Sequence, residues 1–282
     1  MKCFLSGLLC LLLTGAASAA TDTAAPVEVQ ASMMLDGSII VAPDGHVAGY
    51  AIDDADEVPP VVRKLLTQAI PSWSFEPVVR DGKAVEAKSA MALRIVAKPR
   101  DDGKVSIGVA GARFYSDGAS SDVVTYRHKR PPIYPRSAGM DGASATVFVL
   151  LRVNRQGKVD DATATQVNLK TRGSAAQMDQ WRKSFADASL TAARRWTFNM
   201  PTSGNSAQYT FVQVAVSFLM VRDMKAFERH MYGKWQPYIP GPRQPVPWVD
   251  ASSIANGSDV MPADGLVTLG QGGLHLTTRL GG

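Results

Sequence analysis

The pattern Trp-x-Phe occurs twice in this chain, each time after a helical pattern and before a strand of alternating residues. The first copy is Trp73 with Phe75, and the second is Trp196 with Phe198. Two residues separated by one point to the same side of an extended chain, so both rings can fill the gap between a helix and a sheet. We therefore interpret these four aromatic side chains as core residues rather than a ligand cage, each contributing roughly 2–3 kcal/mol.

The elements around Trp-x-Phe recur in one order: strand, glycine turn, strand, helix, Trp-x-Phe, strand. The glycine of the first turn is Gly45 and that of the second is Gly157, and the second copy has the longer connection before its helix. Such self-similarity indicates an internal duplication. The predicted fold class is α+β, with two small tandem domains. Each domain is predicted to hold an antiparallel sheet of about three strands with one packed helix.

The N-terminus has the features of a secretory signal peptide. Lys2 gives a positive start, residues 4–13 are mostly apolar, and Ala17-Ser18-Ala19 is a small-x-small cleavage site. An uncleaved membrane anchor is the alternative. The predicted organisation is a signal peptide at 1–19, a lead-in at 20–34, a degenerate first domain at 35–98, a linker at 99–130, a second domain at 131–221, and a short helix with a Pro/Gly-rich, partly disordered tail at 222–282.

Cysteine usage and charge exclude several classes of protein. Cys3 and Cys10 are the only cysteines and both lie in the leader, so the mature chain has no disulfide or thiol chemistry. The formal charge of +5 is modest and predicts no nucleic-acid partner. The basic run at 126–130 is interpreted as part of a solvated linker, and contact with acidic lipid headgroups or a protein partner is the alternative.

No motif for chemistry is present. The four histidines have no metal-ligand spacing, and the sequence contains no nucleophile elbow, phosphate loop or zinc-protease motif. The acidic cluster at 53–57 precedes a predicted helix, where carboxylates favour the positive end of the dipole, and a weak calcium site is the alternative. The sequence therefore predicts a protein that is not an enzyme, with no catalytic residue, metal or cofactor.

Binding through a sheet edge is the remaining interpretation. An unpaired edge offers N–H and C=O groups to the strand of another chain. Residues 208–219 form the longest predicted strand of the second domain. Its candidate partner-binding side chains lie on one face: Tyr209, Phe211, Gln213, Ala215 and Ser217. The same edges would also allow a homo-oligomer.

Residues 132–220 resemble the C-terminal domain of TonB, the periplasmic energy transducer of Gram-negative bacteria. The first domain is a weaker match, with Asp44-Gly45-x-Val47 and Trp73-x-Phe75-x-Pro77. The motifs of the stronger match are Pro132-x-Tyr134-Pro135, the strand from Gly142 to Val153 with Asn154-Arg155-Gln156-Gly157-Lys158-Val159 after it, Phe185-x-Asp187-Ala188-x-Leu190-x-Ala192, and Arg195-Trp196-Thr197-Phe198.

The resemblance implies a helix–sheet domain that binds the TonB box of outer-membrane receptors by adding a strand to its last strand. It adds Tyr134, Pro135 and Arg136 to the candidate contacts. It also implies TonB-dependent receptors and the ExbB–ExbD motor as partners, and a role in energy-dependent transport. TonB itself has an uncleaved anchor and a long proline-rich spacer, whereas here the leader is expected to be cleaved and no such spacer precedes the second domain. A periplasmic binding protein is therefore the leading expectation. A structural protein of the cell envelope and an anchored transducer are the alternatives.

Overall fold

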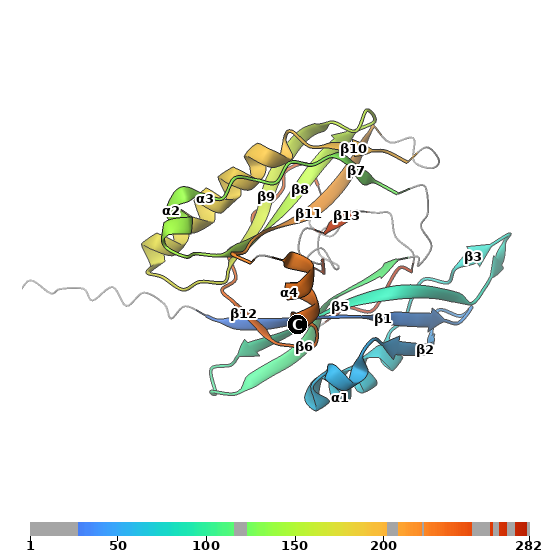
Figure 1. The fold of residues 1–282 in the computed structure, drawn as a ribbon. Helices are drawn as coiled ribbons and strands as arrows, with labels where there is room; N and C mark the ends of the chain where they lie inside the picture. The colour runs from blue at the N-terminus through green and yellow to red at the C-terminus, as the bar shows by residue number, and fades with distance from the viewer. Residues whose placement is uncertain are drawn as a thin grey trace, which may run out of the picture.

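The computed structural model describes residues 28–115, 123–201, 208–221, 223–249, 260–261, 265–269 and 274–280. The predicted signal peptide and most of the predicted lead-in lie outside these residues. The described chain mixes helix and strand, and strand predominates. Figure 1 shows two sheets as layers, with α3 on the outer side of one and α1 on the outer side of the other.

The first sheet has five strands in the order β12-β1-β5-β6, and β2 also pairs with β1. All neighbours are antiparallel. The bounds are β1 Gln30–Val41, β2 Val47–Ile52, β5 Ala87–Pro99, β6 Val105–Tyr115 and β12 Gln236–Tyr238, with the small hairpin β3 Val79–Arg80 and β4 Lys83–Ala84 beside it. Three features differ from prediction. The strand β1 begins within the predicted lead-in, β6 comes from the predicted linker, and β12 comes from the predicted tail.

The second sheet has the order β13-β11-β8-β9. Its four strands are antiparallel, and a separate pair joins β7 to β10. The bounds are β7 Thr125–His128, β8 Ala145–Asn154, β9 Val159–Leu169, β10 Thr197–Asn199, β11 Tyr209–Phe218 and β13 Leu266–Thr268. The prediction of about three strands is therefore too low for both sheets, because segments distant in sequence extend each of them.

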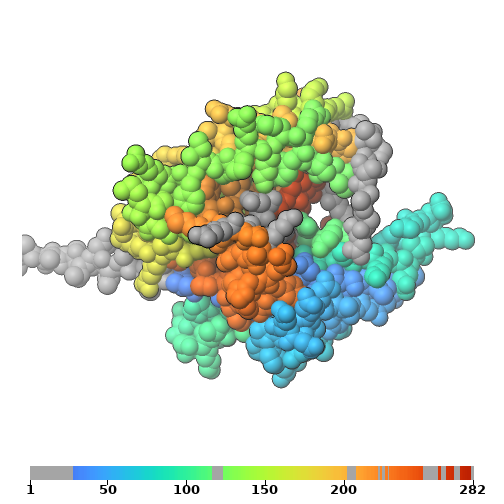
Figure 2. Space-filling model, in the orientation of Figure 1, coloured from blue at the N-terminus to red at the C-terminus, as the bar shows by residue number. Residues whose placement is uncertain are grey.

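Four α-helices are described: α1 Pro60–Ala69, α2 Arg136–Met140, α3 Ala175–Ala193 and α4 Met224–Met231. Proline at the first position starts α1, where its missing N–H is not needed. A capping box starts α3, because Ser174 accepts from the Gln177 amide and the Gln177 side chain accepts from the Ser174 amide. Figure 2 shows the orange residues of α4 at the front, between the layers that hold the two sheets.

Each Trp-x-Phe segment closes on the preceding glycine turn in the same way. The amide of Phe75 donates to the Gly45 carbonyl at 2.8 Å, and the amide of Phe198 donates to the Gly157 carbonyl at 2.8 Å. The four aromatic side chains of the two Trp-x-Phe segments are buried, with exposures of 0–4%: Trp73, Phe75, Trp196 and Phe198. The two pairs lie in separate cores, one under α1 and one under α3.

Candidate binding site

The strand β11 presents its two faces to different surroundings. Val212, Val214 and Val216 pack toward α3 in the second core. The alternate residues face the other sheet, as the period of two requires. There Ala215 packs with Phe148 of β8 and Met261 of the tail.

The edge of β11 is already paired within the chain. The register of β13 places Val267 opposite Gln213. Flanking bonds run from the Ala215 amide to the Gly265 carbonyl at 3.1 Å and from the Leu269 amide to the Phe211 carbonyl at 2.8 Å. The prediction of an open edge along this strand is therefore wrong over these residues. The cause is a β-branched stretch of the tail that the sequence analysis assigned to a partly disordered region.

The structure separates the predicted contact residues into two groups. Tyr134 lies on the helix side, where its ring meets Phe185 at 5.7 Å and Phe218 at 5.5 Å, edge to face. Its hydroxyl donates to the Ala143 carbonyl. Pro135 caps α2 and the exposed Arg136 begins it. The β11 group faces the opposite way: Tyr209, Phe211, Gln213, Ala215 and Ser217.

The burial of the β11 group also differs from what a contact surface requires. Gln213 and Ala215 are each 1% exposed. Phe211 is half-buried because its ring stacks on Trp248 at 5.6 Å, and the Arg152 guanidinium lies over both Trp248 and Tyr209. A peptide could therefore reach this face only after the tail moves, whereas the backbone edge is blocked by β13 alone.

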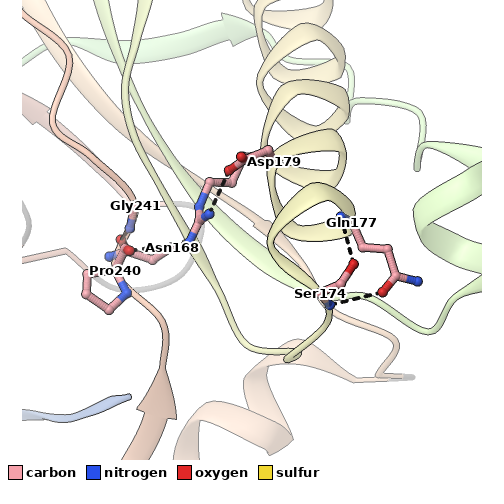
Figure 3. Close-up of polar contacts among 7 residues, drawn as sticks. Asn168, Ser174, Gln177, Asp179, Pro240 and Gly241 are labelled. Atoms are coloured by element: carbon pink, nitrogen blue, oxygen red, sulfur yellow. Dashed lines mark hydrogen bonds and ion pairs between the residues drawn. The ribbon is translucent and has the colours of Figure 1, made fainter. Parts of the chain in front are cut away.

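The proline-rich segment covers the opposite edge of the second sheet. The Ile239 and Leu169 backbones exchange two hydrogen bonds, at 2.7 and 3.0 Å. Figure 3 shows the next contact, in which the Asn168 side chain accepts from the Gly241 amide at 3.1 Å. Arg182 of α3 donates to the Pro240 carbonyl at 3.4 Å. The segment therefore adds to β9 along its edge instead of trailing from the domain.

A cavity of about 570 Å³ lies between the two sheets, and α4 and β12 also line it. Its size is within the range of small-molecule pockets. Its lining mixes apolar and charged side chains, among them Met34, Arg94, Phe148, Lys170, Ala215 and Tyr232. Sequence analysis missed it because its two walls come from different sheets.

Burial shifts the pKa values of two polar side chains that line the cavity, Lys170 and Tyr232. Burial lowers the pKa of Lys170, whose ammonium contacts the Gln236 side-chain oxygen at 3.5 Å. Burial raises the pKa of Tyr232 to about 12, so its hydroxyl stays protonated at neutral pH. That hydroxyl donates to the Asp53 carbonyl at 2.6 Å. Lys170 thus contacts the strand β12 across the cavity, and Tyr232 ties the end of α4 to the loop after β2.

We expect the free energy of unfolding to rise with pH in an alkaline window because of Lys170. Its pKa in the folded state lies below the ordinary 10.5, so between the two values the unfolded chain binds more protons and stability increases with pH. Below the folded-state pKa, Lys170 is charged in both states, so the free energy of unfolding is reduced by the full cost of burying the ammonium group. Lys170→Met should therefore lose this rise and be no less stable at pH 7. Urea unfolding at several pH values, with the exposed Lys64→Met as control, measures both effects.

Among the described residues, no group of three or more His, Cys, Asp or Glu side chains is arranged to hold a metal ion. Within the same ranges, no helix has the length and hydropathy needed to cross a bilayer. The sequence matches no protein-family model, and comparisons with curated proteins and with solved structures give no match either.

Proposed function

We propose that this chain is a non-enzymatic binding protein of the bacterial envelope, built from two tandem units related to the C-terminal domain of TonB. The order of the sheets supports this proposal. In the first unit the hairpin β1–β2 pairs through β1 with β5, a strand that comes after Trp73 and Phe75, which gives the order β2-β1-β5. In the second unit the hairpin β8–β9 pairs through β8 with β11, which comes after Trp196 and Phe198, and this gives the equivalent order β9-β8-β11. The equivalent backbone bonds of Phe75 and Phe198 to their turn glycines support it further.

In this proposal the ligand is an extended peptide that pairs with β11, as the TonB box of an outer-membrane receptor would. One observation carries it: β13 pairs with only three residues of the ten-residue β11. The edge therefore accepts an extended segment by backbone pairing, which makes little demand on sequence. A net contribution of about 1 kcal/mol per hydrogen bond makes so short a strand replaceable by a longer one.

The test is peptide binding with β13 disabled. Proline has no N–H and cannot join the middle of a ladder, so Val267→Pro should release the edge. We expect a TonB-box peptide to bind the variant about tenfold more tightly than the wild-type chain, because an intramolecular competitor is lost. Val79→Pro, at an exposed strand outside both sheets, is the control for proline itself. Calorimetry measures both affinities.

A structural role in the envelope is the second candidate, and the tail favours it. The segment after α4 pairs with β1 through β12, with β9 at Ile239, with β11 through β13, and with Phe75 at Leu276. A chain whose tail joins both sheets in this way suits a rigid element. If neither the wild-type chain nor Val267→Pro binds the peptide, the binding proposal is wrong and this candidate remains.

We propose a periplasmic location after cleavage of the leader, and an anchored transducer working with ExbB–ExbD is the alternative. N-terminal sequencing of the protein from the periplasmic fraction separates the two. A chain that begins at Ala20 has lost the apolar segment that an anchor requires. A chain that begins at Met1 and stays with the inner membrane would support the transducer.

A further inference from the structure

Six basic residues from three separate parts of the sequence meet on one surface of the second unit. We call this the basic surface, and it consists of Arg127, Lys129, Arg130, Lys158, Arg194 and Arg195. Pairing of β10 with β7 places Thr197 opposite His128, and a bridge joins Thr197 to Lys158. The end of α3 supplies the last two cations directly before Trp196.

The backbone of this region is held firmly. The Trp196 indole donates to the Arg130 carbonyl at 2.8 Å. The Tyr126 ring meets Trp196 edge to face at 5.7 Å, and the Lys129 ammonium lies 4.7 Å from the centre of the Tyr126 ring. The Arg130 backbone is therefore anchored to the buried Trp196, and the half-buried Lys129 rests on the Tyr126 ring, whereas the Arg130 side chain is exposed.

Within the described part of the chain, no carboxylate pairs with these cations. The stretches 123–136, 155–159 and 188–200 contain no Asp or Glu. Among the described residues, none of the six forms an ion pair, and Arg127 donates instead to the neutral Asn199 side chain at 3.1 Å. Residues 123–201 hold thirteen Lys and Arg against five Asp and Glu, whereas residues 28–115 hold ten against twelve. The positive charge of the chain is thus concentrated in the second unit.

An exposed apolar side chain lies beside these cations. Ile133 is 89% exposed, the largest value among the exposed hydrophobic residues of the described chain. It sits between two anchored points, the Arg130 carbonyl bonded to Trp196 and the Tyr134 ring packed on Phe185. Figure 1 shows this green segment running from β7 along α3 to α2. Its position between fixed neighbours holds Ile133 toward solvent.

We propose that the basic surface binds the phosphate headgroups of an anionic lipid bilayer, with Ile133 inserted among them. Cations near an anionic membrane each contribute about 1 kcal/mol, and an apolar side chain at the same level adds burial at the interface. An acidic protein segment would need the cations but not the exposed Ile133, so the combination favours lipid. None of the six cations belongs to β11 or β13, so this inference does not depend on the peptide-binding proposal.

The test is co-sedimentation of the full chain with phosphatidylglycerol-containing vesicles and with pure phosphatidylcholine vesicles. Arg130→Gln, Lys158→Gln, Arg194→Gln and Arg195→Gln together remove four exposed charges whose side chains form no hydrogen bond or ion pair within the part of the chain that the structure describes. We expect this variant to partition at least about 100-fold more weakly onto the anionic vesicles. Ile133→Ser should weaken partitioning about tenfold.

The matched control removes four exposed charges elsewhere, at Lys64, Arg80, Lys83 and Lys88. This control variant should partition onto the anionic vesicles less than about fivefold more weakly than the wild-type chain. Salt screens the attraction between the membrane and charges that lie far from it. Equal losses in both variants would overturn the proposal. Displacement by inorganic phosphate alone would mark a simple anion site, and binding to polyglutamate without binding to vesicles would mark an acidic protein partner; either result contradicts the bilayer.

Discussion

Gly157→Ala is expected to lower the free energy of unfolding by about 3 kcal/mol. Gly157 has φ +76°, which side-chain-bearing residues rarely adopt, and an added Cβ would lie 2.0 Å from the Phe198 carbonyl oxygen. A left-handed conformation costs about 1–2 kcal/mol, and forcing the backbones apart adds a comparable amount. The bond from the Phe198 amide to the Gly157 carbonyl would weaken as the segment moves away. Urea unfolding monitored by circular dichroism measures the loss.

Two further glycines make this test specific. Gly82 has φ +75° and no atom within 4 Å of an added Cβ, so Gly82→Ala should cost only about 1 kcal/mol. Gly45 has φ +88° and an added Cβ there would meet the Phe75 carbonyl oxygen at 2.3 Å. Gly45→Ala should therefore behave like Gly157→Ala. If all three variants lose the same amount, the close approach of turn and Trp-x-Phe segment has no energetic weight.

Trp196→Ala is expected to lower the free energy of unfolding by about 3–5 kcal/mol, the range for deleting a large buried aromatic ring. Trp196 is 1% exposed and contacts Tyr126 edge to face. Its removal also leaves the Arg130 carbonyl without its donor. Because β7 and the segment after it rest on this ring, the loss should extend to the order of residues 125–130. Hydrogen exchange together with urea unfolding measures both effects.

Trp196→Phe separates packing from the hydrogen bond. It keeps most of the apolar volume and removes the indole N–H, so it should cost about 1–2 kcal/mol. Trp248→Ala is the control for a partly exposed tryptophan, whose ring stacks on Phe211 and lies under the Arg152 guanidinium. A loss at Trp196→Ala no larger than that at Trp248→Ala would contradict the assignment of Trp196 to the core.

The glycine turns and the burial of the Trp-x-Phe side chains were predictable because local chemistry decides them. Gly45 and Gly157 adopt positive φ in tight turns, and Trp196 and Phe198 share one side of an extended segment, which only a core can accommodate. The start of α3 is also decided locally, because Ser174 and Gln177 satisfy each other's backbone groups, although the sequence analysis did not identify this capping box. Each of these features depends on residues a few positions apart.

The extent of the sheets was not predictable, because it depends on partners far away in sequence. The strand β6 contains Gly108 and Gly111, which weaken strand propensity, and it forms because β5 offers a long edge. β13 is too short to be recognised before its pairing with β11 is known. Alternation along β11 placed Gln213 and Ala215 on one face correctly. The alternating pattern contains no information about the tail, which covers that face.

The contact between the end of the chain and the first Trp-x-Phe segment has a consequence for biosynthesis. The amide of Thr277 donates to the Ser74 carbonyl at 2.8 Å, and the amide of Glu76 donates to the His275 carbonyl at 2.9 Å. A growing polypeptide emerges with its amino end first, so residues 74–76 gain these partners only after the ribosome has added the 203 residues that separate Ser74 from Thr277. Termination before His275 would leave the first Trp-x-Phe segment without these bonds, and quality-control proteases would meet it in that state.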